Sequence, residues 1–517
     1  MKRQLSCFIF SLLCLLIWLP PTQALTRPQE RQAFLAALAD LQQGKLVQYE
    51  LIAGRLQHYP LYPYLIYSSL LPQLARANPQ QVQNFLTLYA DTPLADHLRQ
   101  SWLRQLAAEK QWSLFLQFYR PEKNLELECL QRQALWATGK KTQALAQLDK
   151  LLGQHNLLPA ACATVFSLAL QQGGSAQALV WGRIQQAMQT GSLALAIQFA
   201  SLLPTREDQL RFKLWHQVYL SPQLILQPRL FGYTGFLTKN ILLTGMQRLA
   251  EKDAVLAVNI WQRLRQQQPF SVDLQWQVLR VLALALAKAH HPQADQWLWR
   301  VPASYTNDEV AEWRVRAALY QLNWPEAARA LAALPAELHQ QAIWRYWQAR
   351  TAAAQNQVLT AQAIYRDLAL HNDLYGQLAS WQLGQQPLRA INRIKISPLQ
   401  LKAIANLPAM QRAYELYQLH WLPEAYQEWQ WELSQLPEAE YLAAAEVAFN
   451  WGWYERAIAT VNQMRNGQNV LLRFPLAYQQ PILVNAQIRQ LNPAWVFALI
   501  RQESLFSPGA KSSVGAL

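Results

Sequence analysis

The sequence contains little glycine and little charge. Glycine supplies 17 of the 517 residues, or about 3%, against a usual share of roughly 7%, and charged residues make up only 15%. Hydrophobic residues reach 52%, which excludes an intrinsically disordered chain. Alanine, leucine and glutamine are abundant instead, and all three favour helices. We therefore predict an all-α protein.

Several motifs that would announce a chemistry are missing. The sequence has no HExxH or CxxC motif, no glycine-rich phosphate loop and no Gly-x-Ser-x-Gly elbow. Its nine histidines are scattered, and the one adjacent pair, His290 and His291, has no plausible third ligand nearby. We predict no metal site and no cofactor. The basic residues form no runs, which argues against nucleic acid as a partner.

The N-terminus has the pattern of a secretory signal. Lys2 and Arg3 precede an apolar run over 5–19, and a turn-prone stretch then ends at Ala24. The run is shorter than the roughly 20 residues that cross a bilayer, although an uncleaved anchor is the alternative. Cys14 lacks the small preceding residue of a lipoprotein signal. We predict a signal peptide over 1–24 and export to the periplasm.

Cleavage after Ala24 would leave two cysteines, Cys129 and Cys162. In an oxidising compartment they can form one disulfide, and the alternative is a pair of buried free thiols. Loss of the two basic residues of the signal would lower the net charge from +14 to +12. A basic exported protein suits an anionic polymer such as peptidoglycan, acidic lipid or nucleic acid, and composition does not choose among them.

Helical pairs joined by short turns recur along the chain. The clearest pair covers 312–320, turns at Asn323 and resumes at Trp324-Pro325, with proline where its missing N–H is harmless. Turn signals at Asn323 and Asn356 lie 33 residues apart, and those at His420 and Trp451 lie 31 apart. A two-helix period near 34 residues is typical of a helical solenoid. Glycines and aromatics over 228–246 predict an irregular connection.

A helix near the C-terminus carries the candidate for chemistry. Asn492 can cap it, with Pro493 at the first position. Val496, Leu499, Ile500 and Glu503 follow at i, i+3, i+4 and i+7, so they share one face. We expect partial desolvation to raise the pKa of Glu503, as a general acid for glycosidic cleavage requires. The alternative is a glutamate that reaches water at the edge of a core.

The segment around Glu503 resembles a known active-site motif. It reads Ile500-Arg501-Gln502-Glu503-Ser504-x-Phe506-x-Pro508-x-Ala510-x-Ser512-x-x-Gly515-Ala516. It is similar to the first motif of soluble lytic murein transglycosylases, E-S-x-aromatic-N/D-P-x-A-x-S-x-x-G-A-x-G-L-M-Q, with Ser507 in place of the usual Asn or Asp. Further similar segments lie at 61–65, 91–95, 312–316, 344–347 and 473–478.

The resemblance implies an α-superhelix over 25–398, a helical linker domain over 399–475 and the start of a lysozyme-like domain over 476–517. It implies that Glu503 is the catalytic acid and then base, and that Ser512 contacts the sugar. The implied reaction cleaves the glycosidic bond between N-acetylmuramic acid and N-acetylglucosamine and forms a 1,6-anhydro product. The implied partners are peptidoglycan glycan strands, met by peripheral contact with the cell wall, together with cell-wall synthesis or hydrolysis enzymes.

One feature of the motif departs from the family pattern. The expected Gly-Leu-Met-Gln would begin directly after Leu517, and about forty residues after 476 are too few for a self-sufficient core. We therefore expect the chain as given to be inactive. The alternative from another class is a non-catalytic periplasmic helical scaffold that binds glycan or a protein partner. An RNA- or DNA-binding helical repeat is disfavoured by export and by the missing basic runs.

Overall fold

The structure is a computed structural model of the whole chain. Its description covers residues 25–151, 158–172, 176–227, 236–267, 269–371, 373–385, 396–464, 469–512 and 515. The predicted signal peptide over 1–24 lies outside these residues. Within them every regular element is a helix and none is a strand, so the predicted all-α class is confirmed.

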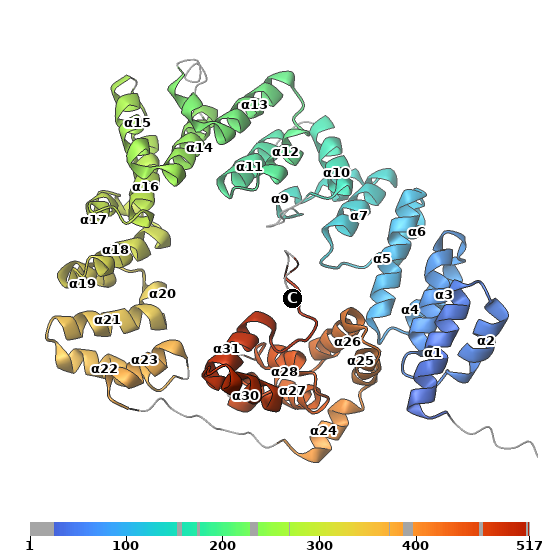
Figure 1. Cartoon of the computed structure of the whole chain (residues 1–517). Coiled ribbons are helices and arrows are strands. Elements are labelled where there is room, and N and C mark those ends of the chain that lie inside the picture. Colours follow the sequence, from blue (N-terminus) through green and yellow to red (C-terminus); the bar gives the residue numbers. More distant parts are fainter. Residues whose placement is uncertain are drawn as a thin grey trace, which may run out of the picture. The chain divides into compact units, whose positions relative to one another are not determined.

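The helices are short and follow one another closely (Figure 1). The α-helices before residue 230 are α1 (Arg27–Gln42), α2 (Leu46–Arg55), α3 (Tyr62–Leu70), α4 (Pro79–Leu88), α5 (Pro93–Ala108), α6 (Trp112–Phe118), α7 (Leu125–Ala137), α8 (Lys141–Leu145), α9 (Leu148–Leu151), α10 (Ala160–Gln171), α11 (Ala176–Gln189), α12 (Leu193–Ala200) and α13 (Arg206–Leu220).

The remaining α-helices are α14 (Phe236–Lys252), α15 (Ala254–Gln267), α16 (Val272–Lys288), α17 (Ala294–Trp299), α18 (Asp308–Tyr320), α19 (Trp324–Ala332), α20 (Ala336–His339), α21 (Ala342–Ala354), α22 (Val358–Leu368), α23 (Leu374–Gln382), α24 (Pro398–Ala405), α25 (Pro408–Gln418), α26 (Leu422–Gln435), α27 (Tyr441–Asn450), α28 (Tyr454–Val461), α29 (Val470–Arg473), α30 (Gln479–Ile488) and α31 (Pro493–Ser504). Four 3₁₀ helices complete the set: η1 (Leu71–Arg76), η2 (Pro222–Leu226), η4 (Ala303–Tyr305) and η5 (Glu438–Glu440).

One turn design joins many of the helical pairs. The first helix ends at a residue with a left-handed backbone conformation. The backbone N–H of the following residue then donates a hydrogen bond to the carbonyl five residues before it. Asn323 N–H thus donates to the Ala318 carbonyl at 2.9 Å, and Trp453 N–H donates to that of Ala448 at 2.9 Å. Left-handed residues stand at Lys110, Gly139, Gly191, Leu322, Asn356, His420 and Gly452. The predicted hairpins are confirmed, and α21 and α22 run side by side in Figure 1.

The chain divides into two compact units. One spans 106–393 with 468–471, and within it successive hairpins pack through a continuous core that includes Phe166, Trp215 and Leu282. Cys129 on α7 and Cys162 on α10 are fully buried there and form a disulfide, so the disulfide alternative holds and the free-thiol alternative does not. Each hairpin buries its apolar face against its neighbours, as in a solenoid.

The other unit combines the two ends of the chain, residues up to 105 with 394–467 and 472–517. Aromatic rings join these distant segments, because Phe34 on α1 lies 5.7 Å from Trp421 before α26. Two ion pairs add to this contact. Arg31 on α1 donates to Glu415 at 2.7 Å, and Arg412 on α25 donates to Asp91 at 3.1 Å. The N-terminal segment therefore packs with the helices that precede the candidate site.

One expected feature, an irregular connection, differs from the structure. The irregular connection expected over 228–246 is wrong for 236–246, which belong to α14, while 228–235 lie outside the described residues. Gly245 is accepted inside α14 because an added Cβ would lie 2.3 Å from Ile225 Cγ2; the glycine marks close packing.

The expected boundaries at 398 and 475 stay a prediction. The two compact units are delimited by contacts within the chain, and one of them contains both 25–105 and most of the predicted linker domain.

Candidate functional site

Glu503 lies in the last turn of α31, and the predicted helix start is confirmed. The Asn492 side chain accepts a hydrogen bond from the Ala494 N–H at 2.9 Å, and Pro493 occupies the first helical position. Asparagine is among the preferred N-cap residues because its side chain satisfies a free N–H of the first turn. The local sequence thus fixes where the helix begins and, through its period, which residues share a face.

The expected desolvation of Glu503 is wrong for the described chain. Glu503 is exposed, and α31 has no fully buried residue. Val496 and Ile500 are half-buried against the core beneath, but Leu499 between them and Glu503 is 44% exposed. Val496 and Ile500 of the predicted apolar stripe therefore contact the core, while no described residue covers Leu499 or Glu503.

The turn after Glu503 is the best-anchored part of the motif. Leu505 and Phe506 both adopt left-handed backbone conformations, with φ of 50° and 65°. Non-glycine residues in this region cost free energy and persist where the surroundings fix them. The Phe506 side chain supplies that fixation, because it is only 3% exposed and packs with Ile458 and Ile482. The aromatic position of the motif therefore fastens the Glu503 turn onto α28 and α30.

Ser512 is exposed and lies nine residues after Glu503 on the same terminal segment. Its carbonyl accepts a hydrogen bond from the Gly515 N–H at 3.0 Å, and Gly515 has a φ of 88°. Gly515 thus adopts a left-handed conformation, for which glycine is suited. The disulfide cysteines belong to the other compact unit and are structural.

A pocket next to this motif was not foreseen from the sequence. We call it the aromatic pocket; it has a volume of about 610 Å³ and is lined by Tyr417, Gln418, His420, Leu422, Trp451, Gly452, Trp453, Tyr454, Glu455, Tyr478, Phe506, Ser507, Pro508 and Gly509. It brings the turn that follows Glu503 together with two hairpin turns of the linker helices. The sequence signal was the aromatic run from Trp451 to Tyr454, which we interpreted only as a turn.

Glu455 is the charged group of the aromatic pocket. Its carboxylate accepts hydrogen bonds from the Tyr426 hydroxyl, from Trp453 Nε1 at 3.2 Å and from the Ser507 hydroxyl. Burial raises the pKa of Glu455, while the hydrogen bond from Ser507 and the charge of Arg456 oppose that shift. Glu455 therefore links α28 directly to the motif that contains Glu503.

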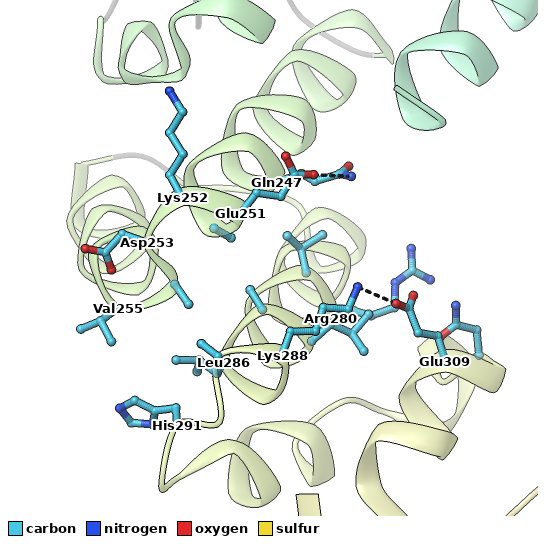
Figure 2. Close-up of a pocket in the computed structure, with 17 residues that line it drawn as sticks. Gln247, Glu251, Lys252, Asp253, Val255, Arg280, Leu286, Lys288, His291 and Glu309 are labelled. Atoms are coloured by element: carbon cyan, nitrogen blue, oxygen red, sulfur yellow. Dashed lines mark hydrogen bonds and ion pairs between the residues drawn. The ribbon is translucent and has the colours of Figure 1, made fainter. Parts of the chain in front are cut away.

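A larger cavity of about 730 Å³ lies in the other unit, between the ends of α14, α15 and α16 and the start of α18. Figure 2 shows its charged side chains, among them Lys288 paired with Glu309 at 2.7 Å. Glu251 is likewise hydrogen-bonded to Gln247 at 3.3 Å and paired with Arg248. Both of these carboxylates are thus already paired within the protein, and no residue of the recognised motif lines the cavity. We do not assign it as the active site.

Metal-binding clusters and membrane-spanning helices are both absent from the described part of the chain. No group of three or more His, Cys, Asp or Glu side chains is arranged to hold a metal ion among the described residues. None of the helices in the described ranges combines the length and the hydropathy needed to span a bilayer.

Comparison with known proteins identifies the family. Residues 403–465 match the family model described as the soluble lytic murein transglycosylase L domain, inside the predicted linker domain. Lytic transglycosylase Slt of Pseudomonas aeruginosa, solved as an inactive glutamate-to-glutamine mutant, is 32% identical, with a TM-score of 0.82 over 94% of this chain and 79% of that one. The chain belongs to the soluble lytic transglycosylase family.

Other members of the family agree with this assignment. The soluble lytic murein transglycosylase of Escherichia coli K12 is 26% identical over 95% of this chain and 76% of its own length. A structure of the 70-kDa soluble lytic transglycosylase with bulgecin A has a TM-score of 0.80 at 24% identity and covers 95% of this chain and 79% of that one. At that identity the structure supports the helical-hairpin fold of this family member.

Proposed function

We propose that this chain is a peptidoglycan lytic transglycosylase in which Glu503 is the catalytic residue. The observation that carries the proposal is the 32% identity to a lytic transglycosylase over 94% of the chain, combined with the motif from Glu503 to Gly515. The inactive form of that relative carries a glutamate-to-glutamine change. Loss of activity on such a change is what a glutamate acid–base mechanism predicts.

In the proposed reaction Glu503 first donates its proton to the glycosidic oxygen between N-acetylmuramic acid and N-acetylglucosamine. The bond from this oxygen to the muramoyl C1 then breaks, and the N-acetylglucosamine end leaves as an alcohol. The Glu503 carboxylate next accepts the proton of the muramoyl C6 hydroxyl, whose oxygen bonds to C1 and closes a 1,6-anhydro ring. One carboxylate thus serves as acid and base, unlike the paired carboxylates of most glycosidases.

The structure supports a role for Glu503 through its placement. Its carboxylate is accessible to a polymeric substrate, and the following turn is held by buried Phe506. Ser512 extends from the same segment and is proposed to contact the sugar. Export by the signal at 1–24 would bring the protein to its substrate in the periplasm, where synthesis and hydrolysis enzymes of the wall are candidate partners.

The test is an activity assay on the open reading frame that encodes this chain, expressed in full. Purified sacculi are digested, and the products are separated and identified by mass. We expect 1,6-anhydro muropeptides from the product of that complete reading frame, as distinct from the chain as given, and a loss of about 1,000-fold in rate from its Glu503→Gln variant. The matched control is Glu50→Gln, which changes an exposed glutamate on α2. Hydrolysed, non-anhydro products, or full activity in Glu503→Gln, would contradict the proposal.

The scaffold alternative makes a different prediction in the same experiment. A non-catalytic glycan-binding scaffold would sediment with sacculi and release no fragments, and the parent and Glu503→Gln would behave alike. The net charge of +14 is compatible with both functions, so retention on sacculi alone does not discriminate between them. Product formation does.

A further inference from the structure

The aromatic pocket combines three tyrosines with one carboxylate, since Tyr417, Tyr454, Tyr478 and Glu455 all line it. Burial raises the pKa of Tyr417 and of Tyr478. The Tyr417 hydroxyl also donates to the Gly452 carbonyl at 3.3 Å.

The walls of the pocket are rings, but not all of their faces are available. Trp453 is stacked between Tyr417 and Tyr426, with centroid distances of 4.8 and 5.4 Å, so neither of its faces can accept a ligand. Tyr478 is different, because it is 42% exposed and contacts Tyr454 only through an edge-to-face arrangement. Half-buried Trp451 adds a second ring to the lining.

The charge balance indicates the class of ligand. The Arg456 guanidinium lies 4.3 Å from the Tyr426 ring centroid and 5.6 Å from that of Trp453, so a positive charge accompanies the Glu455 carboxylate. Burial lowers the pKa of Arg456, but the charge of Glu455 opposes this shift. The Arg456 side chain does not line the pocket, so Glu455 is the carboxylate that a ligand would meet there. A site with one carboxylate, several hydroxyls and an exposed ring favours a polyhydroxylated ligand over an anion. Its volume of about 610 Å³ lies in the range usual for small-ligand sites.

The backbone around the pocket is fixed before any ligand arrives. Tyr478 adopts a left-handed conformation with φ of 52° although it is not glycine, as do Leu505 and Phe506. Buried neighbours hold these residues, since Ala477 is 2% exposed and Phe506 is 3% exposed. Strained positions held by a core are common at ligand sites, because a preformed site loses less entropy on binding.

We propose that the aromatic pocket is a second saccharide site, separate from Glu503, that binds one N-acetylated hexose unit of a glycan strand. Tyr478 contacts the sugar face, the Tyr454 hydroxyl donates to the acetamido carbonyl, and Glu455 accepts from the amide N–H or from a sugar hydroxyl. This inference rests on the proposed function for the identity of the glycan. Because Ser507, Pro508 and Gly509 line the pocket, an occupied site would hold a strand beside the motif that carries Glu503.

The test is a titration of the purified chain with N,N′,N″,N‴-tetraacetylchitotetraose, followed by tryptophan fluorescence and by calorimetry. We expect saturable binding that is weakened at least fivefold in Tyr478→Ala and in Glu455→Gln, as the loss of a contact or hydrogen bond predicts. Tyr478 is exposed, so its substitution tests the site even if Glu455→Gln unfolds. Tyr320→Ala, at a 64% exposed tyrosine of the other unit, is the matched control and is expected to bind like the parent. Maltotetraose, which lacks acetamido groups, is expected to bind at least fivefold more weakly.

Glu503→Gln separates this inference from the proposed function. It is expected to retain the parent affinity for the tetrasaccharide while losing turnover of sacculi. Absence of saturable binding to the parent, or equal affinity in the parent, Tyr478→Ala and Glu455→Gln, would overturn the second site. Binding that is lost in Glu503→Gln but kept in Glu455→Gln would also overturn it, since the sugar would then occupy the Glu503 site alone. Turnover by Glu503→Gln would refute the proposed function without affecting the binding result.

Discussion

Glu428 on α26 provides a sharp test of the energetics that join the chain's two ends. Its carboxylate is fully buried and accepts hydrogen bonds from Arg412 Nε at 2.9 Å and from the Tyr64 hydroxyl at 2.9 Å. Arg412 also donates to the Asp91 carbonyl oxygen at 2.6 Å. Burial raises the pKa of Glu428 from an ordinary 4.5 to about 7, although Arg412 and Tyr64 both oppose the shift. Desolvation therefore outweighs the ion pair.

The raised pKa fixes the sign of a stability effect. The folded state binds the Glu428 proton more tightly than the unfolded state, so this group's stabilisation is complete below about pH 4.5 and is lost as the pH rises to about 7. A shift of about 2.5 pH units corresponds to roughly 3 kcal/mol. Glutamine resembles the protonated acid and does not titrate. Between pH 4.5 and 8 we therefore expect Glu428→Gln to gain up to about 3 kcal/mol relative to the parent protein.

The measurement is urea denaturation of both proteins at pH 4.5, 6 and 8, followed by tryptophan fluorescence. Glu50→Gln, at an exposed position on α2, serves as the control and is expected to change the free energy of unfolding by less than about 0.5 kcal/mol at each pH. If the attraction between Arg412 and Glu428 outweighed the cost of burying the carboxylate, Glu428→Gln would lose stability relative to the parent as the pH rises. That outcome, or parallel pH profiles, would refute the reasoning.

Three further predictions concern stability and are checked by thermal and chemical denaturation. Gly376→Ala should destabilise the protein by about 2 kcal/mol or more, because the added Cβ would lie 1.9 Å from a backbone carbonyl oxygen. The control Gly182→Ala has no atom within 4 Å of its added Cβ and should stabilise the protein by about 0.5–1 kcal/mol. Equal effects of the two substitutions would contradict the packing argument. Arg31→Met should cost about 3 kcal/mol, since it removes the ion partner of Glu415, which is 3% exposed. The control Arg27→Met affects an exposed pair and should cost less than about 1 kcal/mol. Reduction of the disulfide, which closes a loop of 33 residues, should cost roughly 3–4 kcal/mol, and an unchanged midpoint would refute that figure.

Local patterns predicted the fold well because each repeat encodes its own turn. The segment from Glu312 through Asn323 to Trp324 carries a helix period, a capping residue and a proline restart, and the structure follows it closely. The disulfide was predictable because only two cysteines follow the predicted signal peptide. The irregular connection expected over 236–246 failed for a different reason. Gly245 is needed there because Ile225 and Val218 pack closely against it, and not because the chain turns. A local sequence pattern does not contain this contact.

The site was predictable only as far as one segment of the chain could define it. The capping signal at Asn492 gave the correct helix start, and Val496 and Ile500 contact the core as expected. Leu499 and Glu503 are exposed, because what covers a face depends on residues remote in the sequence. Glu455 illustrates the same point, because its carboxylate interacts with Ser507, some fifty residues later in the chain. The contact of Tyr64 with Glu428 spans 364 residues and has no local signature at all.

These long-range contacts suggest how the position of Glu503 is determined. The helix that bears it is only half-buried, through Val496, Phe497 and Ile500, so the turn that follows adds to the contacts that place it. That turn is held at two points, by Phe506 among buried apolar side chains and by the hydrogen bond from Ser507 to Glu455. Both contacts are made with α28, whose hairpin partner α27 packs in turn on α24. The linker helices therefore act as the support of the proposed catalytic residue, and substitutions buried among them should affect turnover without any contact to the substrate.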